Sequence, residues 1–191
     1  MTQNIFRSVI FLFIINCLGC STILTATTED EIRLHPGKRT FGTVIDDQQI
    51  ETVTKVNLNK AHADLYNAHI NVTSFNGVVL LTGQVKSTEL RQLASDTATK
   101  IKKVRQVYNE LQIQGKTSIL ARTNDSWLTT KVKSKLMANK DIDSGRIKVV
   151  TEDGTIYLMG LLSRIEADRA AEIARTTGGV QKVVKAIEYI D

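Results

Sequence analysis

The sequence predicts an α+β fold of two tandem αββαβ units, each a three-stranded sheet packed on two helices. Asn-Gly and Asp-Gly pairs at 76–77 and 153–154, each between short apolar runs, are typical of tight hairpin turns. A repeat period near eighty residues indicates duplicated domains rather than a solenoid. The helical apolar pattern occurs twice at a constant shift of 78 positions, as Ile50, Thr54 and Leu58 and as Leu128, Val132 and Leu136.

Composition places the chain among ordinary globular proteins. Of its 191 residues, 42% are hydrophobic, 24% are charged and only 5% are aromatic, so aliphatic side chains must build the cores. The formal net charge of +5 contains no long run of one sign, and it predicts no more than weak attraction to acidic partners.

The N-terminal segment has the features of a secretory signal peptide. Arg7 precedes an apolar run at 9–15 that is too short to span a bilayer, and Cys17-Leu-Gly-Cys20 follows. This ending resembles a bacterial lipobox, although Cys17 stands where leucine is usual. We therefore expect a signal peptide at 1–19 and a lipid on Cys20 as the only attached group. The alternative is an ordinary cleaved signal with two incidental cysteines. Ser21 after Cys20 resembles the sorting context for the outer membrane.

Residues 20–45 show little periodicity and contain the only proline, so we expect a lipidated N-terminus followed by a tether. The first repeat is expected at 46–114 and the second at 124–191, joined by a linker at 115–123. Units of about 70 residues are marginally stable alone, so we expect the two copies to pack on each other.

Each copy begins with an amphipathic helix, through Ile50, Val53 and Leu58 in the first and Leu128, Val132 and Leu136 in the second. Asp125 is predicted to cap the second of these helices. Strands are expected at 70–73 and 147–151. The returning strands, at 78–82 and 155–159, are apolar at successive positions, which predicts that both their faces are covered. Gly83 and Gly160 are predicted to end them.

A second helix and a last strand complete each copy. In the first copy the helix carries one continuous stripe from Leu90 to Ile101, and in the second it follows a capping-box pattern at 163–166. The last strands are expected at 107–113 and 183–190.

The segment 124–138 holds the candidate site, because it contains the only tryptophan and three lysines within five positions. On a helical count, Trp127, Lys131, Ser134 and Ala138 lie about 60° to 120° to one side of Leu128. The first copy has Gln49 and Val53 where the second has Trp127 and Lys131, so the shared fold does not require these side chains. A tryptophan flanked by lysines suits a lipid headgroup boundary. The alternative is that Trp127 fills the contact between the domains and the lysines are a solvated face.

Other chemistry has little support. His35, His62 and His69 share no metal-ligand spacing, and neither a phosphate-binding loop nor a nucleophile elbow occurs. We expect His35, beside Pro36, to be a turn residue. The basic run 100–105 is interpreted as a helix C-terminus, and Tyr157 and Tyr189 as core or rim residues. We therefore expect neither an enzyme, nor a metal, nor a nucleic-acid partner.

The duplicated αββαβ pattern, with the segments 76–83 and 153–160, resembles the BON domain. Together with the lipobox and with 124–132 and 149–154, it resembles the dual-BON outer-membrane lipoproteins over nearly the whole chain. The resemblance implies a monomeric protein on the periplasmic face of the outer membrane that supports envelope integrity. It also implies association with the division site and with outer-membrane assembly machinery. Docking such a protein partner through the first domain or an inter-domain groove is the alternative function. The anionic phospholipid site implied for the second domain consists of Trp127, Thr130, Lys131, Ser134, Lys135 and Ala138.

Overall fold

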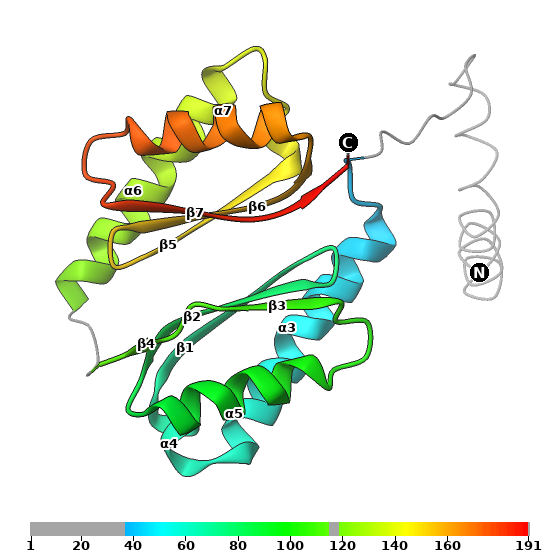
Figure 1. Ribbon diagram of the computed structural model, residues 1–191, viewed down its shortest axis with the longest axis vertical. Coiled ribbons are helices and arrows are strands. Elements are labelled where there is room, and N and C mark those ends of the chain that lie inside the picture. The colour runs from blue at the N-terminus through cyan, green and yellow to red at the C-terminus, as the bar shows by residue number, and fades with distance from the viewer. Residues whose placement is uncertain (1–36, 115–118, 191) are drawn as a thin grey trace, which may run out of the picture. The chain divides into compact units, whose positions relative to one another are not determined.

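The computed structural model describes residues 37–114 and 119–190 (Figure 1). The expected signal peptide, Cys20, His35 and most of the tether lie outside these ranges. We call 37–114 the first domain and 119–190 the second domain. The first domain contains α3 (Phe41–Ala61), α4 (Ala63–Asn67), β1 (His69–Phe75), β2 (Val78–Val85), α5 (Thr88–Thr99), β3 (Gln106–Asn109) and β4 (Gln112–Ile113). The second contains α6 (Ile119–Ala138), a short 3-10 helix η1 (Ser144–Arg146), β5 (Ile147–Glu152), β6 (Thr155–Leu162), α7 (Arg164–Arg175) and β7 (Lys182–Tyr189).

The order αββαβ occurs twice, which confirms the predicted fold class. In each sheet the returning strand is central: β2 pairs antiparallel with β1 and parallel with β3 and β4, and β6 lies in the same way between β5 and β7. Two details were not predicted. The last strand of the first domain is divided into β3 and β4, and the short helix α4 follows α3. The side chain of His62 caps α4 by accepting a 3.0 Å hydrogen bond from the backbone N–H of Asp64.

Both faces of the central strands are covered, as their continuous apolar sequence predicts. One face of β2 places Val79 and Leu81 in a core with Ile50 of α3 and Ala94 of α5. Its other face packs against the second sheet, in a cluster that both domains share. The shared cluster contains Phe75, Val78, Leu80, Tyr157, Met159 and Ala186. The two copies therefore bury apolar surface against each other, as their small size requires.

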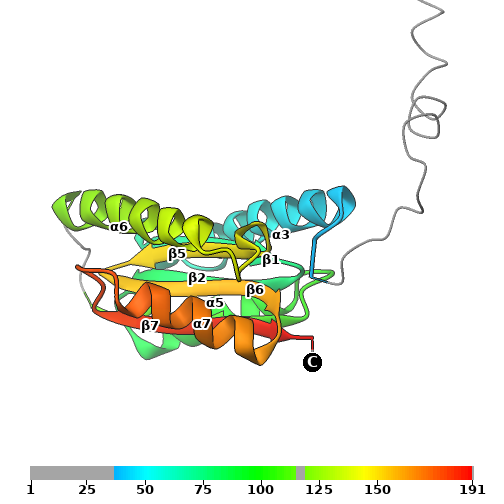
Figure 2. The same ribbon diagram turned by 90° about the horizontal axis from the view of Figure 1, so that it is seen from above.

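The helices lie on the outer faces of the two sheets. Figure 1 shows α3, α4 and α5 outside the first sheet and α6 and α7 outside the second. Viewed from above, α3 and α6 lie along one side of the described protein, and α5 and α7 along the other (Figure 2).

Polar contacts add to the shared cluster at both ends of the central strands. Glu152 Oε1 accepts a 3.0 Å hydrogen bond from Gln84 Nε2, and Glu152 Oε2 accepts one of 2.9 Å from Asn71. Arg105 and Asn76 of the first domain both donate to the carboxylate of Glu188 on β7.

Three sequence predictions are wrong in detail. Gly83 and Gly160 do not end their strands, since β2 continues to Val85 and β6 to Leu162. They are needed inside the strands, because a Cβ on Gly83 would lie 2.0 Å from the carbonyl oxygen of His69 and one on Gly160 would lie 2.7 Å from that of Arg146. Val53 was placed on the core stripe of its helix, but its side chain is 37% exposed and Thr54 takes the buried position.

Asp125 is not a helix cap. The helix α6 begins at Ile119, inside the expected linker, so Asp125 lies within it. The α3 helix likewise begins early, at Phe41 within the expected tether, where the Thr40 hydroxyl accepts a 3.1 Å hydrogen bond from the backbone N–H of Thr43.

Candidate functional site

The helix α6 has one side fixed to the second domain and one side exposed. Leu128, Val132 and Leu136 are at most 1% exposed and join the second-domain core. Asp125, one turn earlier, accepts hydrogen bonds from the backbone N–H groups of Asp153 and Gly154 at 2.8 and 2.9 Å. Packing and these two bonds together fix the rotation of α6, and therefore which residues face solvent.

The exposed side of α6 carries the predicted site. Trp127 is 58% exposed and is absent from the cluster that joins the two domains. The alternative in which Trp127 fills the contact between domains is therefore wrong. Lys131 is half-buried, and the other predicted residues are exposed. These exposed residues are Thr130, Ser134, Lys135 and Ala138.

The lysines on the flank of α6 are oriented by the end of α7. The ammonium of Lys131 lies 4.5 Å from the centroid of the Trp127 ring and donates a 3.0 Å hydrogen bond to the carbonyl of Gly178. The ammonium of Lys135 lies 3.4 Å from the carbonyl oxygen of Thr176. The carbonyls at a helix C-terminus attract cations. One positive charge is thus held beside the exposed indole, and a second lies one turn further along α6.

Sequence reasoning missed Met137 at this surface, and it left Lys133, one of the three lysines it counted, out of the site residues. Met137 is 66% exposed, and it borders a hollow of about 290 Å³ that Lys133, Leu136 and Val149 also line. The signal was present in the sequence, since Met137 lies about 80° from Trp127 on a helical count and away from the core stripe. The exposed side of α6 therefore carries a second large apolar side chain on its last turn.

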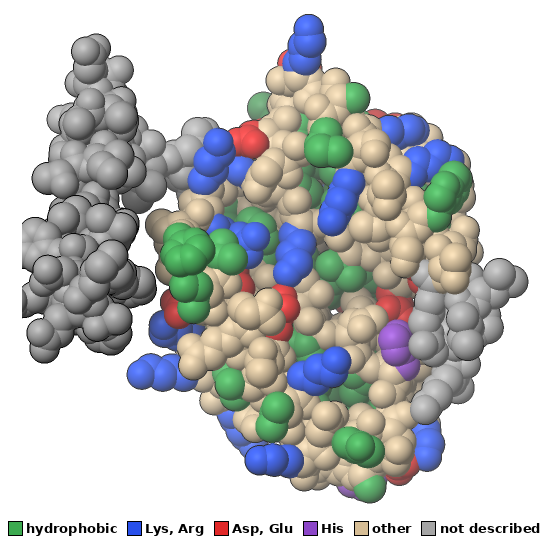
Figure 3. Space-filling view, turned by 180° about the vertical axis from the view of Figure 1, so that it is seen from behind, with side chains coloured by type: hydrophobic (Ala, Val, Ile, Leu, Met, Phe, Trp, Pro, Cys, Tyr) green, Lys and Arg blue, Asp and Glu red, His purple; other side chains and the backbone are tan. Residues whose placement is uncertain are grey.

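The second repeat as a whole is nearly neutral. Residues 124–191 contain 11 basic and 10 acidic residues, a net charge of +1. On the side where α3 and α6 lie, Figure 3 shows Lys and Arg side chains scattered among apolar ones rather than gathered in one patch. Any attraction of the second domain to an anionic surface must then come from the few lysines on α6.

The described residues contain no group of three or more His, Cys, Asp or Glu side chains placed to hold a metal ion. A polar hollow of about 170 Å³ lies where the domains meet, but its Glu152 is already bonded to Asn71 and Gln84. Burial, with the nearby charge of Glu110, raises the pKa of Tyr157 to about 12, and this side chain belongs to the shared cluster.

No helix in the described part of the chain is long and apolar enough to cross a membrane. An exposed indole with neighbouring lysines has the composition of contacts at a lipid headgroup boundary.

Comparisons with known proteins agree with the duplicated architecture. The BON domain matches residues 46–115 and 124–191. The outer membrane lipoprotein DolP of Haemophilus influenzae is 37% identical over 173 residues, which cover 91% of this chain and 90% of DolP. The 21 kDa hemolysin of Actinobacillus pleuropneumoniae is 40% identical over 152 residues, or 80% of this chain and 78% of the hemolysin.

The osmotically-inducible protein Y of Escherichia coli is 30% identical over 145 residues, which cover 74% of this chain and 72% of that protein. The similarity to DolP, an outer membrane lipoprotein, confirms the localisation expected from the sequence, at the outer membrane and facing the periplasm. With the duplicated αββαβ fold and two matched domains, the chain belongs to the BON-domain family and is an envelope-associated member of it.

Proposed function

We propose that this protein binds anionic phospholipid through the exposed side of α6 and thereby supports the integrity of the envelope. Trp127, Thr130, Lys131, Ser134, Lys135 and Ala138 form the contact, and Met137 and Lys133 extend it. A lipid on Cys20 holds the chain at the membrane, and no further cofactor takes part.

The exposed Trp127 beneath the ammonium of Lys131 carries the proposal. A tryptophan that is 58% exposed leaves a large apolar surface in water, a cost that the fold does not require because Gln49 occupies the same position in the first domain. At a headgroup boundary the indole enters the acyl region, and the lysine stems carry their charges up to the phosphates. Small side chains at Thr130, Ser134 and Ala138 allow the helix to approach the surface closely.

The expected binding is weak and reversible. Each lysine near an anionic leaflet contributes about 1 kcal/mol, so Lys131, Lys133 and Lys135 together contribute roughly 3 kcal/mol before the indole is counted. A covalent anchor raises the local concentration of the bilayer around α6 and makes such a weak contact sufficient.

The test uses residues 21–191, without the anchor, and vesicles of phosphatidylglycerol or phosphatidylcholine. Trp127 is the only tryptophan, so its emission reports on this helix alone. We expect a blue shift with phosphatidylglycerol that weakens with added salt, and little shift with phosphatidylcholine. Lys131→Glu with Lys135→Glu should abolish the shift, whereas Lys55→Glu, at the α3 position that corresponds to Lys133, should retain it. A shift of equal size with both lipids, or in the double variant, would refute the proposal.

The anchor is tested separately in cells. Labelling with a palmitate analogue should be lost in Cys20→Ala, and the protein should then be recovered in the soluble periplasmic fraction. Labelling that persists in Cys20→Ala would show that the anchor lies elsewhere.

A further inference from the structure

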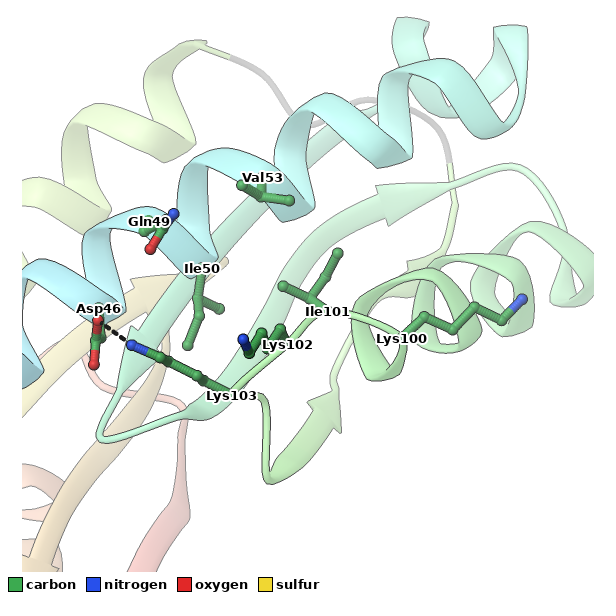
Figure 4. Close-up of a pocket in the computed structure, with 8 residues that line it drawn as sticks. All are labelled: Asp46, Gln49, Ile50, Val53, Lys100, Ile101, Lys102 and Lys103. Carbon is green, nitrogen blue, oxygen red and sulfur yellow. Dashed lines mark hydrogen bonds and ion pairs between the residues drawn. The ribbon is translucent and has the colours of Figure 1, made fainter.

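A hollow in the first domain lies at the position that corresponds to the α6 site. It has a volume of about 210 Å³, and Ile50, Val53 and Ile101 give it an apolar floor. Figure 4 shows Ile50 and Val53 reaching from α3 toward the turn after α5, with Lys103 joined to Asp46 across one end. That ion pair has a length of 2.7 Å.

The two copies carry their lysines on different elements. In the second domain they lie on the first helix, and in the first domain they lie on the turn after the second helix. In the second domain the helix supplies Lys131 and Lys135, which donate to the carbonyls of Gly178 and Thr176. In the first domain the corresponding helix residues are Val53 and Asn57. The corresponding turn residues, at a shift of 76, are Lys102 and Lys100. Both lysines are exposed, and neither has a partner among the described residues.

Apolar side chains extend this hollow along α3. Phe41 is 81% exposed, Ile45 53%, Val56 44% and Val53 37%. On a helical count, positions 41, 45 and 56 lie on the side of α3 that faces away from Ile50 and Leu58, and Val53 lies between that side and Ile50. The first domain therefore presents an apolar strip on α3 beside a lysine-rich turn, which we call the α3 surface.

We propose that the α3 surface docks an acidic, amphipathic segment of a second protein. Its apolar side chains lie on Val53, Ile45 and the floor of the hollow. One carboxylate faces Lys102, and another reaches Lys100, whose side chain extends away from the hollow (Figure 4). The hollow is smaller than the roughly 300–1,000 Å³ of most small-molecule sites, and its size suits an anchoring side chain. The complementary charge of an acidic partner favours the correct encounter and disfavours basic segments.

The arrangement of the helices favours a protein rather than the bilayer as the binding partner of the α3 surface. This inference rests on the proposed function, in which α6 contacts the bilayer. The two sheets face each other, and α5 and α7 cover opposite outer faces of the pair (Figure 1). The hollow lies between α3 and the turn after α5, whereas Lys131 beside Trp127 contacts the end of α7. When Trp127 contacts a bilayer, the hollow of the α3 surface therefore points away from that bilayer and toward the periplasm.

A peptide titration tests the docking. The probe is a fluorescein-labelled helical peptide with leucine at every third and fourth position and glutamate elsewhere, and its control has lysine in place of glutamate. We expect the acidic peptide to bind residues 21–191, and Lys102→Glu or Val53→Asp to weaken binding about tenfold or more, which corresponds to 1.4 kcal/mol or more. Lys55 lies on another side of α3, so Lys55→Glu should bind the acidic peptide with an affinity within about twofold of that of the native chain. Equal binding of both peptides, or equal binding to Lys102→Glu, would overturn the proposal.

Vesicle binding by the same variants identifies the occupant. Val53→Asp should retain binding to phosphatidylglycerol vesicles, and Trp127→Glu should retain binding to the peptide. If Val53→Asp loses vesicle binding, the α3 surface contacts lipid and the proposal is wrong. A photo-crosslinker at Val53 that captures mainly a second copy of this chain in cells would also overturn it. If Trp127→Glu binds vesicles normally, the proposed lipid function fails, whereas the peptide titration still reports on the α3 surface.

Discussion

Asp125 on α6 and Gly154 in the β5–β6 turn are joined by a 2.9 Å hydrogen bond from the backbone N–H of Gly154 to the carboxylate. Asp47 and Gly77 repeat this bond at 2.9 Å in the first domain. The neighbouring N–H groups, of Asp153 and Asn76, donate to the second carboxylate oxygens. In both copies an aspartate within the first helix thus holds the hairpin turn, and the turn in return fixes the position of the helix.

Asp125→Asn should destabilise the second domain strongly. An amide has one acceptor oxygen, so its NH₂ group would face one of the two turn N–H groups and leave that donor unsatisfied. We expect a loss of about 2–4 kcal/mol in the free energy of unfolding, measured by urea denaturation. Asp141→Asn is the control, because Asp141 is exposed and pairs only with the exposed Arg169 at 3.2 Å. Similar losses in both variants would contradict the role assigned to Asp125.

Asp47 should make stability depend on acidity. Burial alone would raise the pKa of Asp47, but hydrogen bonds from Gly77, Arg39, Ser74 and Asn76 outweigh it and hold the pKa below its ordinary value of 3.8. A carboxyl whose pKa is lowered by folding contributes stability above its unfolded pKa and loses that contribution as the pH falls through its folded pKa. The gap in unfolding free energy between the native chain and Asp47→Asn should therefore be widest near neutral pH and narrow below about pH 4. A gap that stays constant down to pH 2 would contradict this account.

Gly83→Ala should prevent folding of the first domain. Gly83 has φ +113° in the middle of β2, and an added Cβ would lie 2.0 Å from the backbone oxygen of His69, which has no room to move within the sheet. We expect a loss of about 4 kcal/mol or more, seen as insoluble or unfolded protein by circular dichroism. Gly42→Ala, near the start of α3 with its nearest contact at 3.8 Å, should be neutral or stabilising. Normal folding of Gly83→Ala would show that the strand does not require glycine.

Met159→Ala should weaken both domains together. Met159 is fully buried in the cluster that joins the two sheets, so truncation leaves a cavity between the domains. We expect a loss of about 2–4 kcal/mol and one cooperative transition in both the native and the variant chain. Met137→Ala, at a side chain that is 66% exposed, should change stability little. Two separate transitions in the native chain would mean that the domains unfold independently.

Much of the fold could be predicted from the sequence because it is duplicated. The helical stripes, the two hairpin turns and the continuous apolar strands each occur twice. The capping box at Ser163 and Glu166 was found from its spacing alone. The errors arose where tertiary contacts decide the local structure. In the sequence, Gly83 and Gly160 look like residues at which a strand ends. They are glycines because backbone oxygens lie too close to leave room for a Cβ. Asp125 resembles a helix cap, but it bonds to a turn 28 residues away.

The candidate site was predictable to a similar extent. The difference between Trp127 and Gln49 indicated a feature that only the second copy has, and the exposure of Trp127 supports its choice as a candidate. The contacts of Lys131 and Lys135 with the end of α7 could not be predicted, because they depend on how two helices far apart in sequence pack. The α3 surface was missed for the same reason. Its lysines were interpreted only as a helix C-terminus, and the packing of α3 against α5 places them beside Val53.

Flotation with phosphatidylglycerol vesicles tests the lipid proposal most directly. Residues 21–191 are compared as the native chain, Trp127→Glu and Gln49→Glu, which adds the same charge at the corresponding position of the first domain. We expect the native chain and Gln49→Glu to float with the vesicles and Trp127→Glu to remain in the soluble fraction with an unchanged thermal midpoint. Flotation of Trp127→Glu to the same extent as the native chain would contradict the assignment of α6 as the lipid contact.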